Sequence, residues 1–229
     1  MASQIGLAVL LSVAEFFSES IAPKIDRFHS LIKEFNAGLM IGFLFLFAIP
    51  ELAAASQANG SAIFVFFLLG FALFHLLEEF LYRHTKNKKL LKKEIGWLHV
   101  GGFYVTGVIE GMALFFFTNL IGLPGGEWLF LPLLLNSVNA SVYMSHLTEK
   151  LKKAKWFAWV WATGPLVGFG LATLLPTMAI THLFFALITG TLLYVVCRDA
   201  LPAENRPRPW IFAIGVALSV ALLLFSGFW

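Results

Sequence analysis

The feature of this sequence that most limits its fold is the alternation of long apolar stretches with short hydrophilic breaks. All 16 Lys and Arg residues fall in four of these breaks, at 23–36, 83–94, 149–155 and 198–208. The breaks between them contain neither residue and lie at 56–61, 118–128 and near 175–178. Because short cytoplasmic loops of membrane proteins collect Lys and Arg, the pattern predicts that the basic breaks are cytoplasmic and the others lie outside.

Composition supports a membrane protein. The chain is 59% apolar and 13% charged, with a mean hydropathy of +0.83, whereas a soluble domain is about 25% charged. The formal net charge of +3 comes from the breaks predicted to be cytoplasmic. It therefore indicates orientation and contact with the lipid bilayer, and we expect no nucleic-acid binding.

The apolar stretches predict about eight transmembrane helices of about 20 residues each. They lie at roughly 3–22, 36–55, 61–82, 97–117, 129–147, 156–176, 178–197 and 209–229. No hydrophilic break is long enough for a soluble domain, so residues 1–229 form one all-α transmembrane domain. An even number of crossings with cytoplasmic basic loops puts both termini outside a polytopic protein, which we expect in the cell membrane.

The first predicted helix has one polar face. Ser12, Glu15, Ser18 and Glu19 recur at helical spacing among Leu, Val and Phe, so we expect this face to point into the helix bundle. The two glutamates and the lack of a basic stretch before them argue against a cleaved signal peptide.

The candidate functional residue with the strongest physical argument is Glu110, near the middle of the predicted helix 97–117. An ionised carboxylate at this depth costs several kcal/mol unless it is paired, hydrated or bound to metal. No Lys or Arg lies in any apolar stretch, so its partners are a metal ion, a proton, water, or hydrogen bonds from Asn136, Asn139 and hydroxyls such as that of Thr106. The alternative is a protonated glutamate with a purely structural hydrogen bond to a neighbouring helix.

Four stretches resemble motifs of the ZIP family of divalent-metal transporters. GLMIGFLFLFAIPELA (38–53, with Pro50 and Glu51) and GFALFHLLEEFLY (70–82) are similar to the second and third helices of that family. GPLVGFGLATLLP (164–176) and ITGTLLYVVCRDALPAE (188–204) are similar to its sixth and seventh helices. The resemblance implies an eight-helix bundle, a homodimer, and transport of a divalent cation of the zinc, iron or manganese class, with the ion as substrate and no cofactor.

The metal-binding positions implied by the resemblance are degenerate. Glu110-Gly111 match the fourth-helix motif, but Thr106 stands at its histidine position, and the fifth-helix positions correspond to Asn136 and Asn139. The implied site therefore consists of Glu110, Asn136, Asn139 and Thr106. One carboxylate with amide and hydroxyl oxygens suits harder ions better than zinc, so we expect at most one weakly held ion.

Three further residues are candidate ligands at an entrance or an exit. Glu51 lies near the outer end of the predicted second helix, where a solvated helix end explains it equally well. His75 and Glu79 are four residues apart, which puts them on one helix face. They lie near the cytoplasmic end, where exposed polar side chains are also expected.

The sequence lacks the motifs of intramembrane enzymes. It has no His-Glu-x-x-His, no Gly-x-Ser-x-Gly and no pair of aspartates inside an apolar stretch, so we do not expect an enzyme. The alternative to a transporter is a transport-inactive ZIP-like membrane protein with a structural, regulatory or partner-binding role.

Overall fold

The computed structural model describes residues 2–25, 28–84, 104–121, 125–147, 155–175, 177–200 and 208–225. Within these ranges the side chains of some helical residues, Glu19, Glu78, Asn139 and His146 among them, lie outside the described residues. The regular structure in these ranges is entirely helical, which confirms the all-α prediction.

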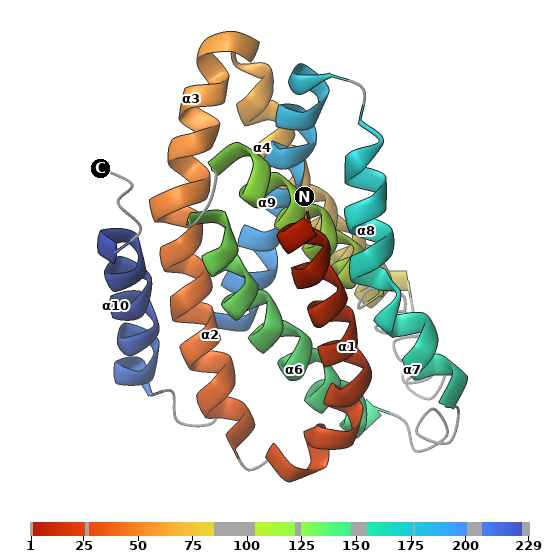
Figure 1. Cartoon of the computed structure of the whole chain (residues 1–229). Helices are drawn as coiled ribbons and strands as arrows, with labels where there is room; N and C mark the ends of the chain where they lie inside the picture. Colours follow the sequence, from red (N-terminus) through yellow and green to blue (C-terminus); the bar gives the residue numbers. More distant parts are fainter. Residues whose placement is uncertain are drawn as a thin grey trace.

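The long helices form one bundle (Figure 1). They are α1 (Ala2–Ile25), α2 (His29–Phe43), α3 (Ile49–Asn59), α4 (Ala62–His84), a helix over 104–116, α6 (Phe130–Leu147), α7 (Lys155–Ala162), α8 (Gly164–Thr173), α9 (Met178–Ala200) and α10 (Pro209–Phe225). Three short helical segments complete the chain order: the π-helical η2 (Leu44–Ala48) and η3 (Phe117–Ile121), and the 3-10 helix η4 (Gly125–Leu129).

The predicted segment 156–176 is two helices, α7 and α8, which meet at Thr163. Pro165 lies in the first turn of α8. Proline has no backbone N–H and clashes with the carbonyl group four residues earlier, so a helix entering from α7 cannot continue unbroken. The Thr163 side chain donates instead to the backbone oxygen of Val160 at 2.6 Å.

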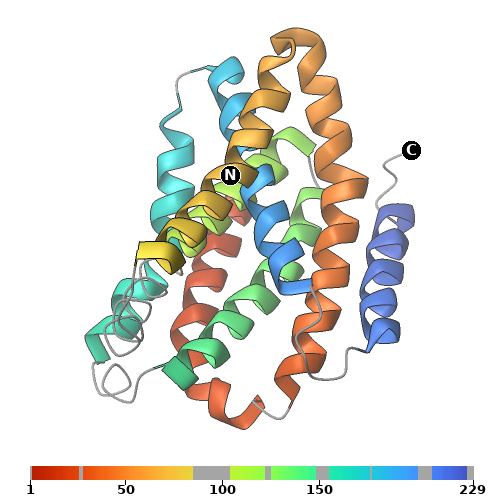
Figure 2. The ribbon, with the colours of Figure 1, turned by 180° about the vertical axis from the view of Figure 1, so that it is seen from behind.

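Glycines bring three pairs of helices into close contact: α4 with α9, α2 with α10, and the 104–116 helix with α8. Figure 2 shows α4 and α9 from behind. At each crossing a side chain would overlap the backbone of the partner helix, as for Gly70, Gly190, Gly38, Gly215, Gly111 and Gly168. Gly170 of α8 is different, because a Cβ atom added there would meet nothing within 4 Å.

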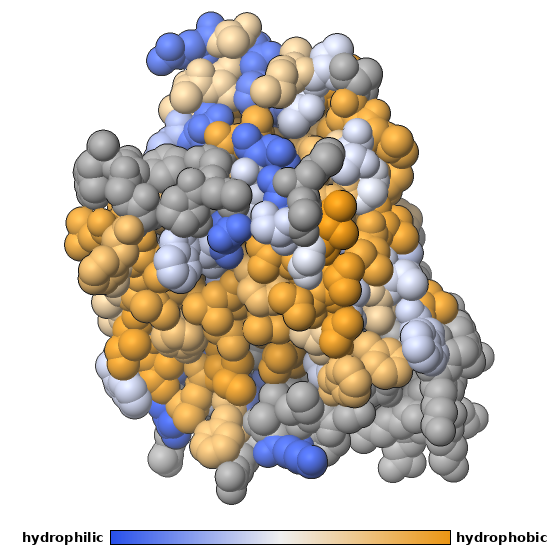
Figure 3. Space-filling view, viewed as in Figure 1, coloured by the Kyte–Doolittle hydropathy of each residue, from blue (hydrophilic) through white to orange (hydrophobic). Residues whose placement is uncertain are grey.

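The first helix has its polar side chains inside and its apolar side chains outside. Gln4, Ser12, Glu15 and Ser18 are buried, as predicted for the last three, while Ile5, Val9, Leu10, Val13 and Phe17 are exposed. Figure 3 shows hydrophobic residues over the middle of this side of the molecule, with hydrophilic residues gathered at the end that carries the α3–α4 connection. A surface helix of a soluble protein has the opposite arrangement.

Two helical stretches in the described ranges are long and apolar enough to cross a membrane, His29–Asn59 and Met178–Cys197. The other apolar helices are shorter: Ser3–Ser18, Ala62–Leu73, Tyr104–Leu120, Glu127–Val138 and Pro209–Phe225. Length and composition are thus consistent with association with a membrane.

Five fully buried phenylalanines join α2, η2, the 104–116 helix, η3 and α9. Neighbouring rings in this phenylalanine layer have centroids 4.7 Å apart for Phe43 and Phe47, 5.1 Å for Phe43 and Phe117, 5.0 Å for Phe117 and Phe185, and 6.3 Å for Phe116 and Phe185. The two π-helical segments contact each other here. Such segments occur frequently at functional sites.

Candidate functional site

Glu110 lies where the 104–116 helix faces α6, and its side chain is 1% exposed. Asn136 of α6 donates from Nδ2 to Glu110 Oε1 at 2.5 Å. The next residue, Ser137, donates from Oγ toward Glu110 Oε2 at 3.2 Å. The expected contact between Glu110 and Asn136 is therefore present, and Ser137 adds a second one.

Of the other residues predicted for this site, Thr106 lies one turn before Glu110 in the same helix and is half-buried. Asn139 lies in α6, one turn after Asn136, and its side chain is outside the described residues.

A second carboxyl group, that of Glu15 in α1, meets Glu110 in this site. Glu15 is 5% exposed, and the Ser137 hydroxyl lies 3.3 Å from its Oε1. The Ser137 hydroxyl thus lies between the two carboxyl groups, which are close enough to interact. A Cβ atom at Gly107 would lie 3.3 Å from Glu15 Oε1, so the glycine leaves space for this carboxyl group.

Sequence reasoning placed Glu15 on the inner face of its helix but missed it as a site residue. The argument that singled out Glu110, a carboxylate in an apolar stretch without Lys or Arg, applies equally to Glu15. Ser137 carried no signal of its own, because a serine in an apolar helix commonly donates to its own backbone.

The candidate entrance residue Glu51 lies in the first turn of α3 and is half-buried. It lies near His182 of α9. Asn59, at the end of α3, has Nδ2 3.4 Å from His182 Nδ1. Glu51 therefore belongs to a polar group between α3 and α9.

The candidate exit residues His75 and Glu79 lie on an exposed face of α4. The His75 Nε2 atom is 3.9 Å from Glu79 Oε2, and Arg83 binds Glu79 Oε1 at 2.5 Å. Because Arg83 already neutralises this carboxylate, an exposed side-chain ion pair accounts for the arrangement.

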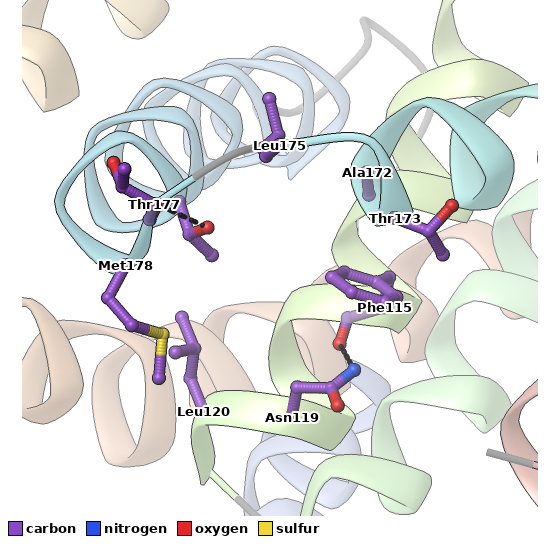
Figure 4. A pocket seen from close by; sticks show the side chains of 9 residues that line it. Phe115, Asn119, Leu120, Ala172, Thr173, Leu175, Thr177 and Met178 are labelled. Atoms are coloured by element: carbon purple, nitrogen blue, oxygen red, sulfur yellow. Dashed lines mark hydrogen bonds between the residues drawn. The ribbon is translucent and has the colours of Figure 1, made fainter.

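A cavity of about 360 Å³ lies between the 104–121 segment, α8 and α9 (Figure 4). Its polar lining consists of Asn119, Thr173, Thr177 and Thr181. Asn119 donates to the Phe115 backbone oxygen at 2.7 Å, and Thr173 and Thr181 donate to backbone oxygens of Gly170 and Thr177 at 2.6 and 2.9 Å. The hydroxyl groups of Thr173 and Thr181 can therefore only accept hydrogen bonds from a molecule in the cavity.

The phenylalanine layer lies next to this cavity, and in the chain it follows Glu110. Phe116 and Phe117 follow Glu110 in the chain and precede Asn119, with Phe116 about 9 Å beyond Glu110 along the helix axis at 1.5 Å per residue. Phe115 lines the cavity and contacts Phe116, with ring centroids 5.8 Å apart.

The described residues contain no group of three or more His, Cys, Asp or Glu side chains that could hold a metal ion. The chemistry available at Glu15, Glu110, Asn136 and Ser137 is that of oxygen ligands and hydrogen bonds. Comparison with protein-family models and with curated proteins finds no match for this sequence.

Proposed function

We propose that this protein spans the membrane as a ZIP-like bundle of about eight helices and moves a divalent metal cation of the zinc, iron or manganese class. The observation that carries the proposal is Glu110, a carboxyl group 1% exposed and held by Asn136 and Ser137 in a bundle with apolar side chains on its outside. An ionisable group inside an apolar bundle marks an ion path more often than a structural contact.

The inverted polarity of α1 supports insertion into a bilayer. Large apolar side chains are also exposed on α4 and α10, including Leu68, Leu76, Ile214 and Leu224. Close glycine crossings between helices are typical of membrane interiors, where burial of apolar surface does not drive association. In such a bundle, local thinning of the bilayer accommodates helices shorter than a full crossing.

The ends of the helices support the proposed topology. The backbone N–H of Arg208, before α10, donates to Glu34 near the start of α2 at 3.1 Å, so the basic breaks 23–36 and 198–208 meet at one end. Asn59 and His182 meet where the break 56–61 adjoins α9, and 56–61 has neither Lys nor Arg. We assign the basic end to the cytoplasm and both termini to the outside.

The test is cation uptake by the full-length protein reconstituted in liposomes, measured for Zn²⁺, Mn²⁺, Fe²⁺, Cd²⁺ and Mg²⁺. Glu110→Gln should abolish uptake, because the neutral amide removes the charge that offsets dehydration of the cation. Glu127→Gln, which changes a carboxylate of η4, is the matched control and should retain uptake. Full uptake by Glu110→Gln would contradict the proposal.

A transport-inactive ZIP-like protein with a structural, regulatory or partner-binding role is the second candidate. The observation that favours it is the missing cluster of three metal ligands among the described residues. In that case the wild-type protein would give no uptake of any of the five ions while folding normally in the same liposomes.

A further inference from the structure

The carboxyl pair has fewer hydrogen-bond donors than acceptors. The single hydroxyl hydrogen of Ser137 faces three acceptors, Glu15 Oε1 at 3.3 Å, Glu110 Oε2 at 3.2 Å and the Leu133 backbone oxygen at 3.2 Å. One hydroxyl donates to one acceptor at a time. Asn136 supplies a second donor, but only to Glu110 Oε1.

The shortage of hydrogen-bond donors is clearest at Glu15. Its Oε2 atom is buried and has no hydrogen-bond partner among the described residues. The Trp161 side chain of α7 also lies near this carboxyl group, and an indole contributes a single N–H. The Oγ atom of Ser12, one turn earlier on the same helix face, is also buried without a described partner. Buried polar atoms normally have partners.

Among the described residues, no positively charged group acts on the pair. Among the described residues, the charged group that acts on Glu15 is Glu110 itself. Lys24 of the same helix is exposed and lies about 13 Å along the axis from Glu15 at 1.5 Å per residue. Two buried carboxyl groups in contact require a cation or a proton between them.

We infer that Glu15 and Glu110 together bind one hard divalent cation of the Mg²⁺ or Mn²⁺ class. The four carboxylate oxygens and the Ser137 hydroxyl oxygen supply the oxygen ligands, and the Asn136 amide nitrogen, which donates to Glu110 Oε1, orients that carboxyl group. No imidazole or thiol among the described residues joins it. Oxygen ligands of this kind favour Mg²⁺ and Mn²⁺ over Zn²⁺. The inference rests on the proposed function and deepens it, because it names the class of cation and adds Glu15 of α1 as a ligand.

The test is equilibrium binding of Mn²⁺ to the purified full chain in detergent, with free Mn²⁺ measured by electron paramagnetic resonance. Wild-type protein should bind one Mn²⁺, and added Mg²⁺ should release it. Glu15→Gln and Glu110→Gln should each weaken binding by about tenfold or more, since affinity follows the number of charged ligands. Glu127→Gln, which changes a carboxylate of η4, should bind as the wild type does.

Mn²⁺ should also raise the thermal midpoint of the wild type, because a ligand that binds only the folded state stabilises it. Glu15→Gln should lose this shift, and Glu15→Asp, which keeps the charge, should regain part of it. The Asp variant keeps the test decisive if Glu15→Gln folds poorly.

Equal Mn²⁺ affinity in wild type and folded Glu15→Gln would overturn Glu15 as a ligand. A folded wild type that binds no Mn²⁺ would mean that the pair holds only a proton, and would also overturn the inference. Uptake lost in Glu110→Gln but unchanged in Glu15→Gln would leave the proposed function standing while this inference fails. Mn²⁺ binding without uptake would support this inference and contradict the proposed function.

Discussion

Gly168 and Gly170 of α8 give a sharp test of how the 104–116 helix is held in place. A Cβ atom at Gly168 would overlap the backbone of Val108, whereas one at Gly170 would have nothing within 4 Å. The two positions lie two residues apart in one helix, so Gly168→Ala and Gly170→Ala change the intrinsic helix preference equally and differ in the contact they create.

The expected effects have opposite signs. Alanine is favoured over glycine in a helix interior by about 0.8–1 kcal/mol, so Gly170→Ala should stabilise the fold by up to about that amount. In Gly168→Ala the same gain is opposed by forcing apart two packed backbones, and overpacking typically costs about 1–3 kcal/mol. Because the obstructing atoms are backbone and cannot rotate away, we expect a cost at the upper end, and a net loss of about 2 kcal/mol.

The assay is unfolding of the detergent-solubilised protein followed by circular dichroism, with Mn²⁺ binding measured on the same samples. Gly168→Ala should also weaken Mn²⁺ binding, because displacement of the 104–116 helix moves Glu110 relative to Ser137 of α6. Equal stability of the two variants would refute the close crossing of α8 with the 104–116 helix.

Three further predictions concern topology, the aromatic core and the degenerate ligands. Cysteines introduced at the ends of the bundle should react with a membrane-impermeant thiol reagent from outside only in the breaks that lack Lys and Arg. We therefore expect labelling of a cysteine at Asn59 and none at Lys153. The reverse pattern would contradict the proposed orientation. Phe117→Ala should lower the free energy of unfolding by about 3–5 kcal/mol, since this ring is fully buried, and Phe45→Ala, whose ring is 56% exposed, should cost far less; similar losses would refute the phenylalanine layer. Thr106→His combined with Ala140→Glu should raise zinc affinity in a direct titration if the backbone has ZIP-like geometry, and no gain would mean that the resemblance is one of helix number alone.

Local features of the fold could be predicted from the sequence, and features that depend on which helices meet could not. Apolar length predicts helices, and the spacing of Ser12, Glu15 and Ser18 predicts a buried polar face, because both depend on residues close in the chain. The contact of Glu15 with Glu110 joins α1 to the 104–116 helix, and no periodicity within either helix shows which helix lies opposite. Gly168 and Gly170 look alike in the sequence for the same reason.

In the candidate site, too, some features were predictable from the sequence and others were not. The Glu110–Asn136 contact was predictable because a carboxyl group in an apolar helix needs a donor, and α6 carries one at a matching depth. The two π-helical segments were not predictable, because such segments are rare, and neither was the contact of Phe43 with Phe47 and Phe117 where the two segments meet.

The exposed apolar surface bears on what surrounds this bundle. The exposed apolar side chains lie on several helices, among them α1, α4, α8 and α10. A protein partner, including a second copy of the chain, covers one face of a molecule, whereas α10 packs on α2, α4 on α9 and α1 on α6. Contiguous apolar patches on soluble proteins are usually limited to a few hundred Å². The proposed bilayer would cover all these helices at once, and it would also account for the buried polar face of α1, because polar groups in a bilayer are stable only when they turn toward one another. Insertion into a membrane, as proposed above, would therefore explain both the carboxyl pair and the apolar exterior.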